Sequence, residues 1–197
     1  MSPGVFAGKV RCRLDRAWLS CVGRMFKLDP WHAHAPYSCR PYKKVVVDLV
    51  NSLKPERVVE VGCGLGDILS RIEARDRLGL DADATVVRAA RFLHPGKVRW
   101  LHGRAEDIAR ALPADGDIDC LIMVNWIHNL SPEELDALLL PVLPRTKHLV
   151  LDALDADAPA SYRFKHNFAF LSKSAERISA ARSFDEPRSF ILFRVTR

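Results

Sequence analysis

The stretch Val58-Val59-Glu60-Val61-Gly62-Cys63-Gly64-Leu65-Gly66-Asp67 decides the fold of this chain. β-Branched apolar residues that run into an acid, and then into glycines at every second position, are typical of a buried strand ending in a glycine turn. An apolar pattern of helical spacing begins at Ile68 and Leu69, which predicts a helix directly after the turn. Glycine has no Cβ and tolerates a positive φ, so the backbone of such a turn can approach a ligand closely. The stretch therefore predicts a ligand-binding turn between a strand and a helix.

Strands and helical segments continue to alternate after this turn. Further strands are predicted at residues 78–81, 98–102, 118–124 and 148–154, and helical segments at 45–53, 84–92, 108–112 and from Ser131. Ser131, Pro132 and Glu134 have the pattern of a capping box with proline at the first helical position. A short helix is predicted from Ser174, and Asp185-Glu186-Pro187 separates two β-rich runs at 178–184 and 188–195, which predicts a terminal hairpin. This order is typical of an α/β fold with a mostly parallel sheet and helices on both faces.

The spacing of the glycines separates two kinds of nucleotide-binding turn. The dinucleotide fingerprint G-x-G-x-x-G needs a glycine at the position of Asp67, whereas this chain has G-x-G-x-G preceded by Glu60. The stretch from Glu60 to Gly66 resembles motif I of the class I methyltransferases that depend on S-adenosylmethionine. The resemblance extends over residues 42–197. It implies a Rossmann-like, seven-stranded sheet that is parallel except for its last strand, and S-adenosylmethionine as the cofactor.

In that family the cofactor contacts lie at the carboxyl ends of successive strands. Asp81 ends the second predicted strand, 21 residues after Glu60, where a carboxylate can accept hydrogen bonds from both ribose hydroxyls. The segment Gly103-Arg104-Ala105-Glu106-Asp107 resembles the adenine-recognition segment, and either Glu106 or Asp107 could read the base. Asn125 begins the segment that resembles motif IV, beside the transferring methyl group. The cofactor-binding residues implied by the resemblance are Glu60, Gly62, Cys63, Gly64, Gly66, Asp81, Ala82, Ala105, Glu106 and Asn125.

Histidines are the candidates for a general base. Methyl transfer from a sulfonium is a direct displacement, so an enzyme mainly positions the two reactants. A hydroxyl acceptor also benefits from a base that titrates near neutrality, which suits histidine. We expect His128 and His166 to be catalytic, with His32 and His34 as the next candidates. The alternative for His128 is a packing role.

Composition and charge favour one intracellular domain with a basic N-terminal segment. Of the 197 residues, 48% are hydrophobic and 27% charged, and no stretch reaches the roughly 18 uncharged apolar residues of a membrane span. The net charge is +6, and residues 1–44 alone carry +7, so the rest sums to −1. The five cysteines form no C-x-x-C pair, which predicts free thiols in a reducing compartment and no zinc site. We expect a cytoplasmic protein, with the inner membrane surface as an alternative location.

Residues 1–44 are predicted to form a basic helix and a loop rich in aromatic and histidine residues, packed on a methyltransferase core at 45–197. The helix covers residues 5–28, with a break near Gly23. Its apolar residues, spaced by three or four, are Val10, Leu14, Trp18, Val22 and Met25. This face either packs on the domain or, with the basic residues in 9–44, contacts an anionic membrane surface, a large anionic acceptor or nucleic acid.

The function predicted from these features is methyl transfer to oxygen, in preference to nitrogen, of a small molecule, sugar or glycan. Asn125-Trp126-Ile127-His128 lacks the Asn-Pro-Pro-Tyr pattern typical of base-amine methylation, and Cys120 has no proline before it as a cytosine nucleophile would. Asp152-Ala153 stands where the metal-dependent catechol enzymes have Asp-Asn, so no metal is expected. The alternatives are a nucleic-acid methyltransferase, and a non-catalytic cofactor-binding adaptor that docks through its basic N-terminal arm.

Overall fold

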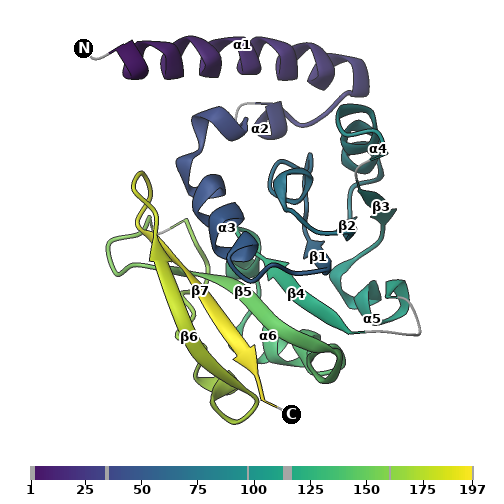
Figure 1. Ribbon diagram of the computed structural model, residues 1–197, viewed down its shortest axis with the longest axis vertical. Helices are drawn as coiled ribbons and strands as arrows, with labels where there is room; N and C mark the ends of the chain where they lie inside the picture. Colours follow the sequence, from purple (N-terminus) through teal and green to yellow (C-terminus); the bar gives the residue numbers. More distant parts are fainter. Residues whose placement is uncertain (1–2, 34–35, 97, 113–116, 160, 197) are drawn as a thin grey trace.

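A computed structural model describes residues 3–33, 36–96, 98–112, 117–159 and 161–196 of the chain. Within these residues seven strands form a single sheet in the order β3-β2-β1-β4-β5-β7-β6 (Figure 1). The strands are β1 (Arg57–Val61), β2 (Asp76–Asp81), β3 (Arg99–His102), β4 (Ile118–Met123), β5 (Thr146–Leu154), β6 (Ala175–Arg182) and β7 (Arg188–Val195). The predicted Rossmann-like sheet is confirmed.

The sheet is parallel from β3 to β5 and antiparallel beyond it. β1 pairs in parallel with both β2 and β4, whereas β7 pairs antiparallel with β5 and with β6. The strand order therefore reverses between β1 and β4, and open α/β sheets bind their ligands at the carboxyl ends of the strands beside such a reversal.

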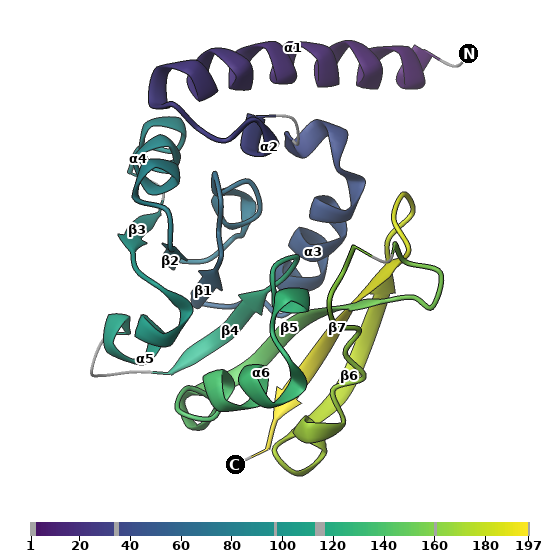
Figure 2. The same cartoon turned by 180° about the vertical axis from the view of Figure 1, so that it is seen from behind.

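Helices cover both faces of the sheet, as predicted (Figures 1 and 2). α3 (Pro41–Asn51) and α4 (Ala84–Leu93) pack on one face, while α5 (Ile108–Ala111) and α6 (Pro132–Leu139) pack on the other. β1 supplies both cores because its side chains alternate: Val58 joins the cluster under α3 and α4, and Val59 and Val61 join the one under α5 and α6.

Local signals explain where these helices begin. The capping box of α6 is present, since Ser131 Oγ accepts a bond from the Glu134 amide (3.2 Å) and Glu134 Oε2 accepts one from the Ser131 amide (2.7 Å). Asp83 caps α4 by accepting bonds from the Thr85 and Val86 amides. The described residues contain no helix that is long and apolar enough to cross a membrane.

Two predicted helices are wrong. The segment after the glycine turn forms only a 3-10 turn, η2 (Leu69–Arg71), because the glycine turn takes up residues 62–66 and leaves few residues for a helix before β2 begins at Asp76. No helix starts at Ser174; the turn η6 (Ala169–Lys173) precedes it, and β6 begins at Ala175 because this edge pairs with β7.

The N-terminal segment differs from the prediction in two ways. α1 (Pro3–Phe26) is not broken at Gly23 and ends three residues later, where Lys27 adopts φ +53 and the Leu28 amide bonds to the Gly23 carbonyl (2.8 Å). The prediction of free thiols is wrong for one pair of cysteines, because Cys12 of α1 forms a disulfide with Cys39. These cysteines are 27 residues apart, so their meeting depends on how the chain folds back.

Candidate functional site

A cleft of about 730 Å³ lies at the carboxyl ends of the central strands. Its walls come from the segments that follow β1, β2, β3 and β4, and from two segments nearer the N-terminus, α2 (Pro30–Ala33) and the start of α3. The predicted cofactor-binding residues that line it are Glu60, Gly62, Cys63, Gly64, Asp81, Ala82, Ala105, Glu106 and Asn125. Gly66, also predicted, does not line it.

The three glycines of the turn have different physical roles. All three have positive φ, at +70 for Gly62, +52 for Gly64 and +78 for Gly66. A Cβ on Gly62 would collide with the ring of Trp126, and one on Gly66 with the ring of Trp100. A Cβ on Gly64 would meet nothing within 4 Å. Gly64 is therefore the glycine that opens the backbone toward the cleft, and the other two allow indole rings to pack on the turn.

Asp81 ties the turn to the second strand. Its Oδ2 accepts a bond from the Gly64 amide (2.8 Å) and its Oδ1 accepts one from the Asp83 amide (3.0 Å). Each carboxylate oxygen can accept more than one hydrogen bond, so Asp81 keeps acceptor capacity toward the cleft that it lines.

Glu60 is a buried acid at the floor of the cleft. Its Oε2 accepts a bond from the Leu69 amide (3.2 Å), and burial raises the pKa of its carboxyl to about 8. Nearby, Lys43 pairs with Asp67 (2.6 Å), and both residues line the cleft. Burial penalises the charged form of Glu60, so a cationic ligand group in the cleft would favour its ionisation.

The segment after β4 forms the wall next to the turn. Trp126 Nε1 donates to the Val61 carbonyl (2.7 Å), which holds the indole against Gly62. Asn125 has φ +75, an uncommon conformation for a residue with a side chain. Its amide donates to Asp152 Oδ1 (3.0 Å), and its side-chain Nδ2 donates to the Tyr42 hydroxyl (2.7 Å).

Sequence reasoning missed Arg188, which holds this wall from β7. The buried guanidinium pairs with Asp152 (2.9 Å) and Glu186 (2.8 Å), and it donates to Asn125 Oδ1 and to the Tyr162 hydroxyl. The only available signal was an arginine at the start of an apolar strand run, which is unusual in a buried strand.

Neither His128 nor His166 lines the cleft. His128 is buried with Nε2 3.1 Å from Asp152 Oδ2, and its Nδ1 donates to the Phe164 carbonyl (3.3 Å). His166 Nε2 donates to the Ile127 carbonyl (3.0 Å), and burial lowers the pKa of its imidazole.

The other two histidine candidates lie in the N-terminal segment. His32 of α2 lines the cleft beside Trp31, and Arg40 lies over the Trp31 ring, 5.5 Å from its centroid. His34 lies outside the described residues. α2 thus supplies an indole and an imidazole to one side of the cleft.

Residues 58–147 match the model of a family described as "Methyltransferase domain". This match, together with the fold, supports a methyltransferase that uses S-adenosylmethionine. The methyltransferase matches none of the curated proteins at the level of sequence. Among the described residues, no group of three or more His, Cys, Asp or Glu side chains is arranged to hold a metal ion.

Solved structures with the same fold have low sequence identity to this methyltransferase. One is the N-methyltransferase NodS from Bradyrhizobium japonicum WM9 in complex with S-adenosyl-L-homocysteine, at a TM-score of 0.67 and 14% identity, covering 91% of this chain and 98% of that chain. Another is the magnesium protoporphyrin IX methyltransferase ChlM from Synechocystis PCC 6803 with bound S-adenosylmethionine, at 0.58 and 16%, covering 80% of each chain.

Proposed function

We propose that this methyltransferase modifies an oxygen, in preference to a nitrogen, of a small molecule or of the end of a sugar or glycan. The observation that carries the small-acceptor part of this proposal is the size of the cleft, and His32 in its lining favours a hydroxyl acceptor. About 730 Å³ must hold both cofactor and acceptor, and ligand pockets span about 300–1,000 Å³. The space beside the cofactor therefore suits a small acceptor or a chain end.

The residues that line the cleft fit S-adenosylmethionine. Gly64 leaves open space where a side chain would stand, which allows the backbone to approach the ligand closely. Asp81 has acceptor capacity for ribose hydroxyls, and Glu60 offers a carboxyl that a cationic group would ionise. Ala105 and Glu106 form the side of the cleft proposed for the adenine. When bound, the cofactor supplies an electrophilic methyl group on a sulfonium.

The chain's own contribution to catalysis is orientation of the acceptor. The positive φ of Asn125 is fixed by bonds to Tyr42, Arg188 and Asp152, so this wall is rigid before any ligand arrives. Burial raises the pKa of Tyr42 to about 12, which keeps its hydroxyl protonated at neutral pH. Orientation of a near-attack pair can lower a barrier by about 7–11 kcal/mol.

A hydroxyl acceptor also needs somewhere to send its proton. His32 lines the cleft, and we propose it as the base in place of the deeper histidines. His128 and His166 then act as positioning residues, because they bond to the carbonyls of Phe164 and Ile127 and so hold the segments on either side of the wall.

Methyl transfer from isotopically labelled S-adenosylmethionine into a cell extract tests the acceptor class. We expect the label in a low-molecular-weight or glycan product as a methyl ether or ester, identified by mass spectrometry. An N-methyl product would contradict the oxygen assignment, and label in RNA or DNA would favour a nucleic-acid substrate. His32→Ala should lower kcat, with unchanged affinity for S-adenosylhomocysteine; an unchanged kcat would remove His32 as the base.

A further inference from the structure

We propose that α1 docks the enzyme on an anionic lipid bilayer. α1 has two apolar faces, and the domain uses only one of them. The inner face packs through Leu19 and Val22 on Val86 and Ala89 of α4, and all four side chains are buried. This contact anchors the helix and leaves its outer side without a protein partner among the described residues.

The outer face of α1 carries large apolar side chains in solvent. The exposed fractions are 40% for Val10, 66% for Leu14, 54% for Trp18 and 60% for Met25. Their spacing of four, four and seven residues places them in one stripe along the helix. Phe92 of α4, 47% exposed, stacks on Trp18 with 6.5 Å between ring centroids and widens the stripe. A contiguous exposed patch of this kind marks an interaction surface.

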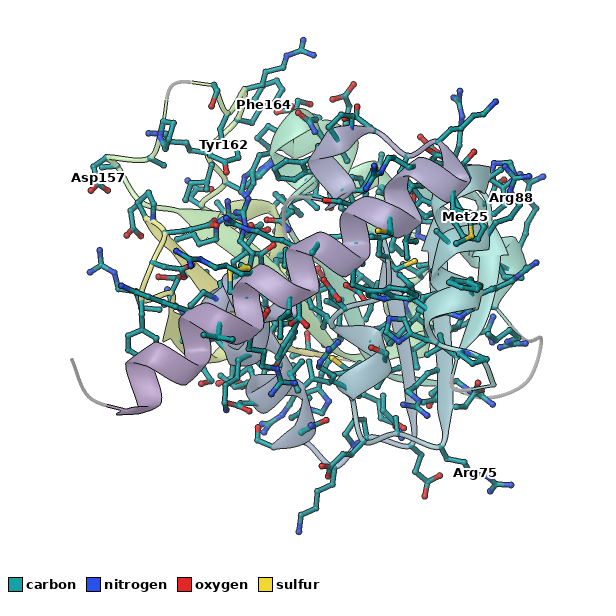
Figure 3. All side chains as sticks on the ribbon, turned by 90° about the horizontal axis from the view of Figure 1, so that it is seen from above. Met25, Arg75, Arg88, Asp157, Tyr162 and Phe164 are labelled. Atoms are coloured by element: carbon teal, nitrogen blue, oxygen red, sulfur yellow. A yellow bond between two sulfur atoms is a disulfide. The ribbon has the colours of Figure 1, made fainter. Side chains whose placement is uncertain are left out.

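Positive charge borders this stripe. Figure 3 looks down on α1, and at its C-terminal end Met25 lies beside Arg88 of α4. The acid of α1, Asp15, accepts a bond from Ser38 (2.5 Å) on the inner side. The exposed cations of α1 and its last turn are Lys9, Arg11, Arg13, Arg16, Arg24 and Lys27.

Some of these cations also border a shallow groove. Lys9, Arg13 and Arg16 line it together with Cys12 and Ser38, on the side of the helix that faces Ser38. Cations along an interfacial helix suit lipid phosphate groups, with the apolar stripe buried in the acyl boundary.

The combination of the apolar stripe and the cations distinguishes among the possible binding partners of this face of α1. A second copy of the chain, paired through the same face, would bring two rows of cations together without acids to offset them. Nucleic acid would match the cations and leave Leu14 and Met25 in water. An anionic bilayer satisfies both features, because interfacial helices bury an apolar face and hold basic residues at the headgroups.

The fold leaves the cleft free when α1 is docked. In Figures 1 and 2 α2 lies between α1 and the sheet, and none of the described residues that line the cleft belongs to α1. The Cys12–Cys39 disulfide holds α1 to the turn η1 (Tyr37–Cys39), which leads into α3. Docking therefore places the bilayer on the side of α1 opposite α2.

Vesicle flotation of the full chain tests this proposal. We expect binding to phosphatidylcholine vesicles containing about 30% phosphatidylglycerol, weak binding to phosphatidylcholine alone, and a decrease with salt. Tryptophan fluorescence should shift to the blue and be quenched by brominated lipid, and replacement of Trp18 should remove most of this response. Equal binding to both kinds of vesicle, or to neither, would overturn the proposal.

Two double variants separate the apolar and the electrostatic contributions. Leu14→Ser with Trp18→Ser should weaken vesicle binding at least about tenfold, because both exposed side chains are removed from the stripe. The matched control is Leu140→Ser with Phe184→Ser, whose side chains are 66% and 91% exposed elsewhere on the molecule. The control should bind vesicles like the unmodified chain.

For charge, Arg13→Glu with Arg16→Glu should weaken binding by about 25-fold or more, at roughly fivefold per cation removed. Arg75→Glu with Lys173→Glu, two exposed cations away from α1, is the control and should have a small effect. Thermal melting and affinity for S-adenosylhomocysteine verify that every variant is folded. Sedimentation that shows a dimer lost in the Leu14→Ser, Trp18→Ser variant would assign the stripe to a second copy instead.

Discussion

Substitution of Gly64 by alanine isolates the close approach of the turn to its ligand. Gly64 has φ +52, and its missing Cβ would meet nothing within 4 Å, so a methyl group fits without collision and enters the cleft. Alanine in this left-handed conformation should lower the unfolding free energy by about 1–2 kcal/mol. In a chain of this size that corresponds to a fall in Tm of about 2–4 °C for each kcal/mol.

Gly96 supplies a matched control for the backbone strain. It has φ +68, and its missing Cβ also meets nothing within 4 Å, but it lies outside the cleft. Gly96→Ala should therefore lower the unfolding free energy by a similar amount. Gly62→Ala is a different perturbation, because its Cβ collides with the ring of Trp126 and forces the wall to shift.

Calorimetric titration with S-adenosylhomocysteine separates the two alanine variants. We expect Gly64→Ala to weaken binding at least about tenfold, or 1.4 kcal/mol, because the methyl group occupies space that the ligand needs. Gly96→Ala should bind like the unmodified chain. Equal affinity for all three proteins, with both variants folded, would refute the claim that the backbone at Gly64 contacts the cofactor.

Three further perturbations concern stability. Burial raises the pKa of Glu60 to about 8 from 4.5, so the stability contributed by its neutral form is complete below about pH 4.5 and is lost as pH rises through about 8. Urea unfolding should show a slope of at most about 1.4 kcal/mol per pH unit across this window, absent in Glu60→Gln; identical slopes would place the titration elsewhere. Arg188→Met should cost about 3–5 kcal/mol in urea unfolding, because it removes the arginine partner of the buried Asp152 carboxylate. Arg188→Lys should recover part of the loss, whereas a neutral effect of Arg188→Met would show that the pair does not stabilise the fold. Cys12→Ser or Cys39→Ser should lower the unfolding free energy by about 2–4 kcal/mol, measured by thermal melting. In the presence of a reductant, these variants and the unmodified chain should melt alike. Cys21→Ser, which changes a free thiol, should leave stability unaltered.

The parts of the site that could be predicted depend on local signals. A strand that ends in glycine, or in an acid such as Glu60 or Asp81, can be recognised within about ten residues of sequence. Parallel strands bring their carboxyl ends to one edge, so these separate local predictions converge on one place without knowledge of the packing. This is why the turn, Asp81 and Asn125 line the same cleft.

The parts that could not be predicted depend on contacts between distant segments. Arg188 reaches Asn125, 63 positions earlier, only because β7 returns antiparallel beside β5 and pairs Arg188 with Leu154. His128 lies outside the cleft lining for the same reason. The direction of a side chain in an irregular segment is decided by the partners that surround it, in this case Asp152 and the Phe164 carbonyl.

α1 shows that correct periodicity leaves the direction of a helix open. The sequence pattern groups Val22 with Leu14 and Trp18 in one stripe, yet the structure buries Val22 and exposes the other two. Adjacent positions on the wheel can serve opposite faces when a helix is apolar over a wide arc, and only the packing on α4 decides which residues turn inward. Burying the outward residues would stabilise by about 25 cal/mol per Å² of apolar surface. The domain itself does not bury these residues. The neighbouring cations favour a negatively charged surface as the place where they are buried.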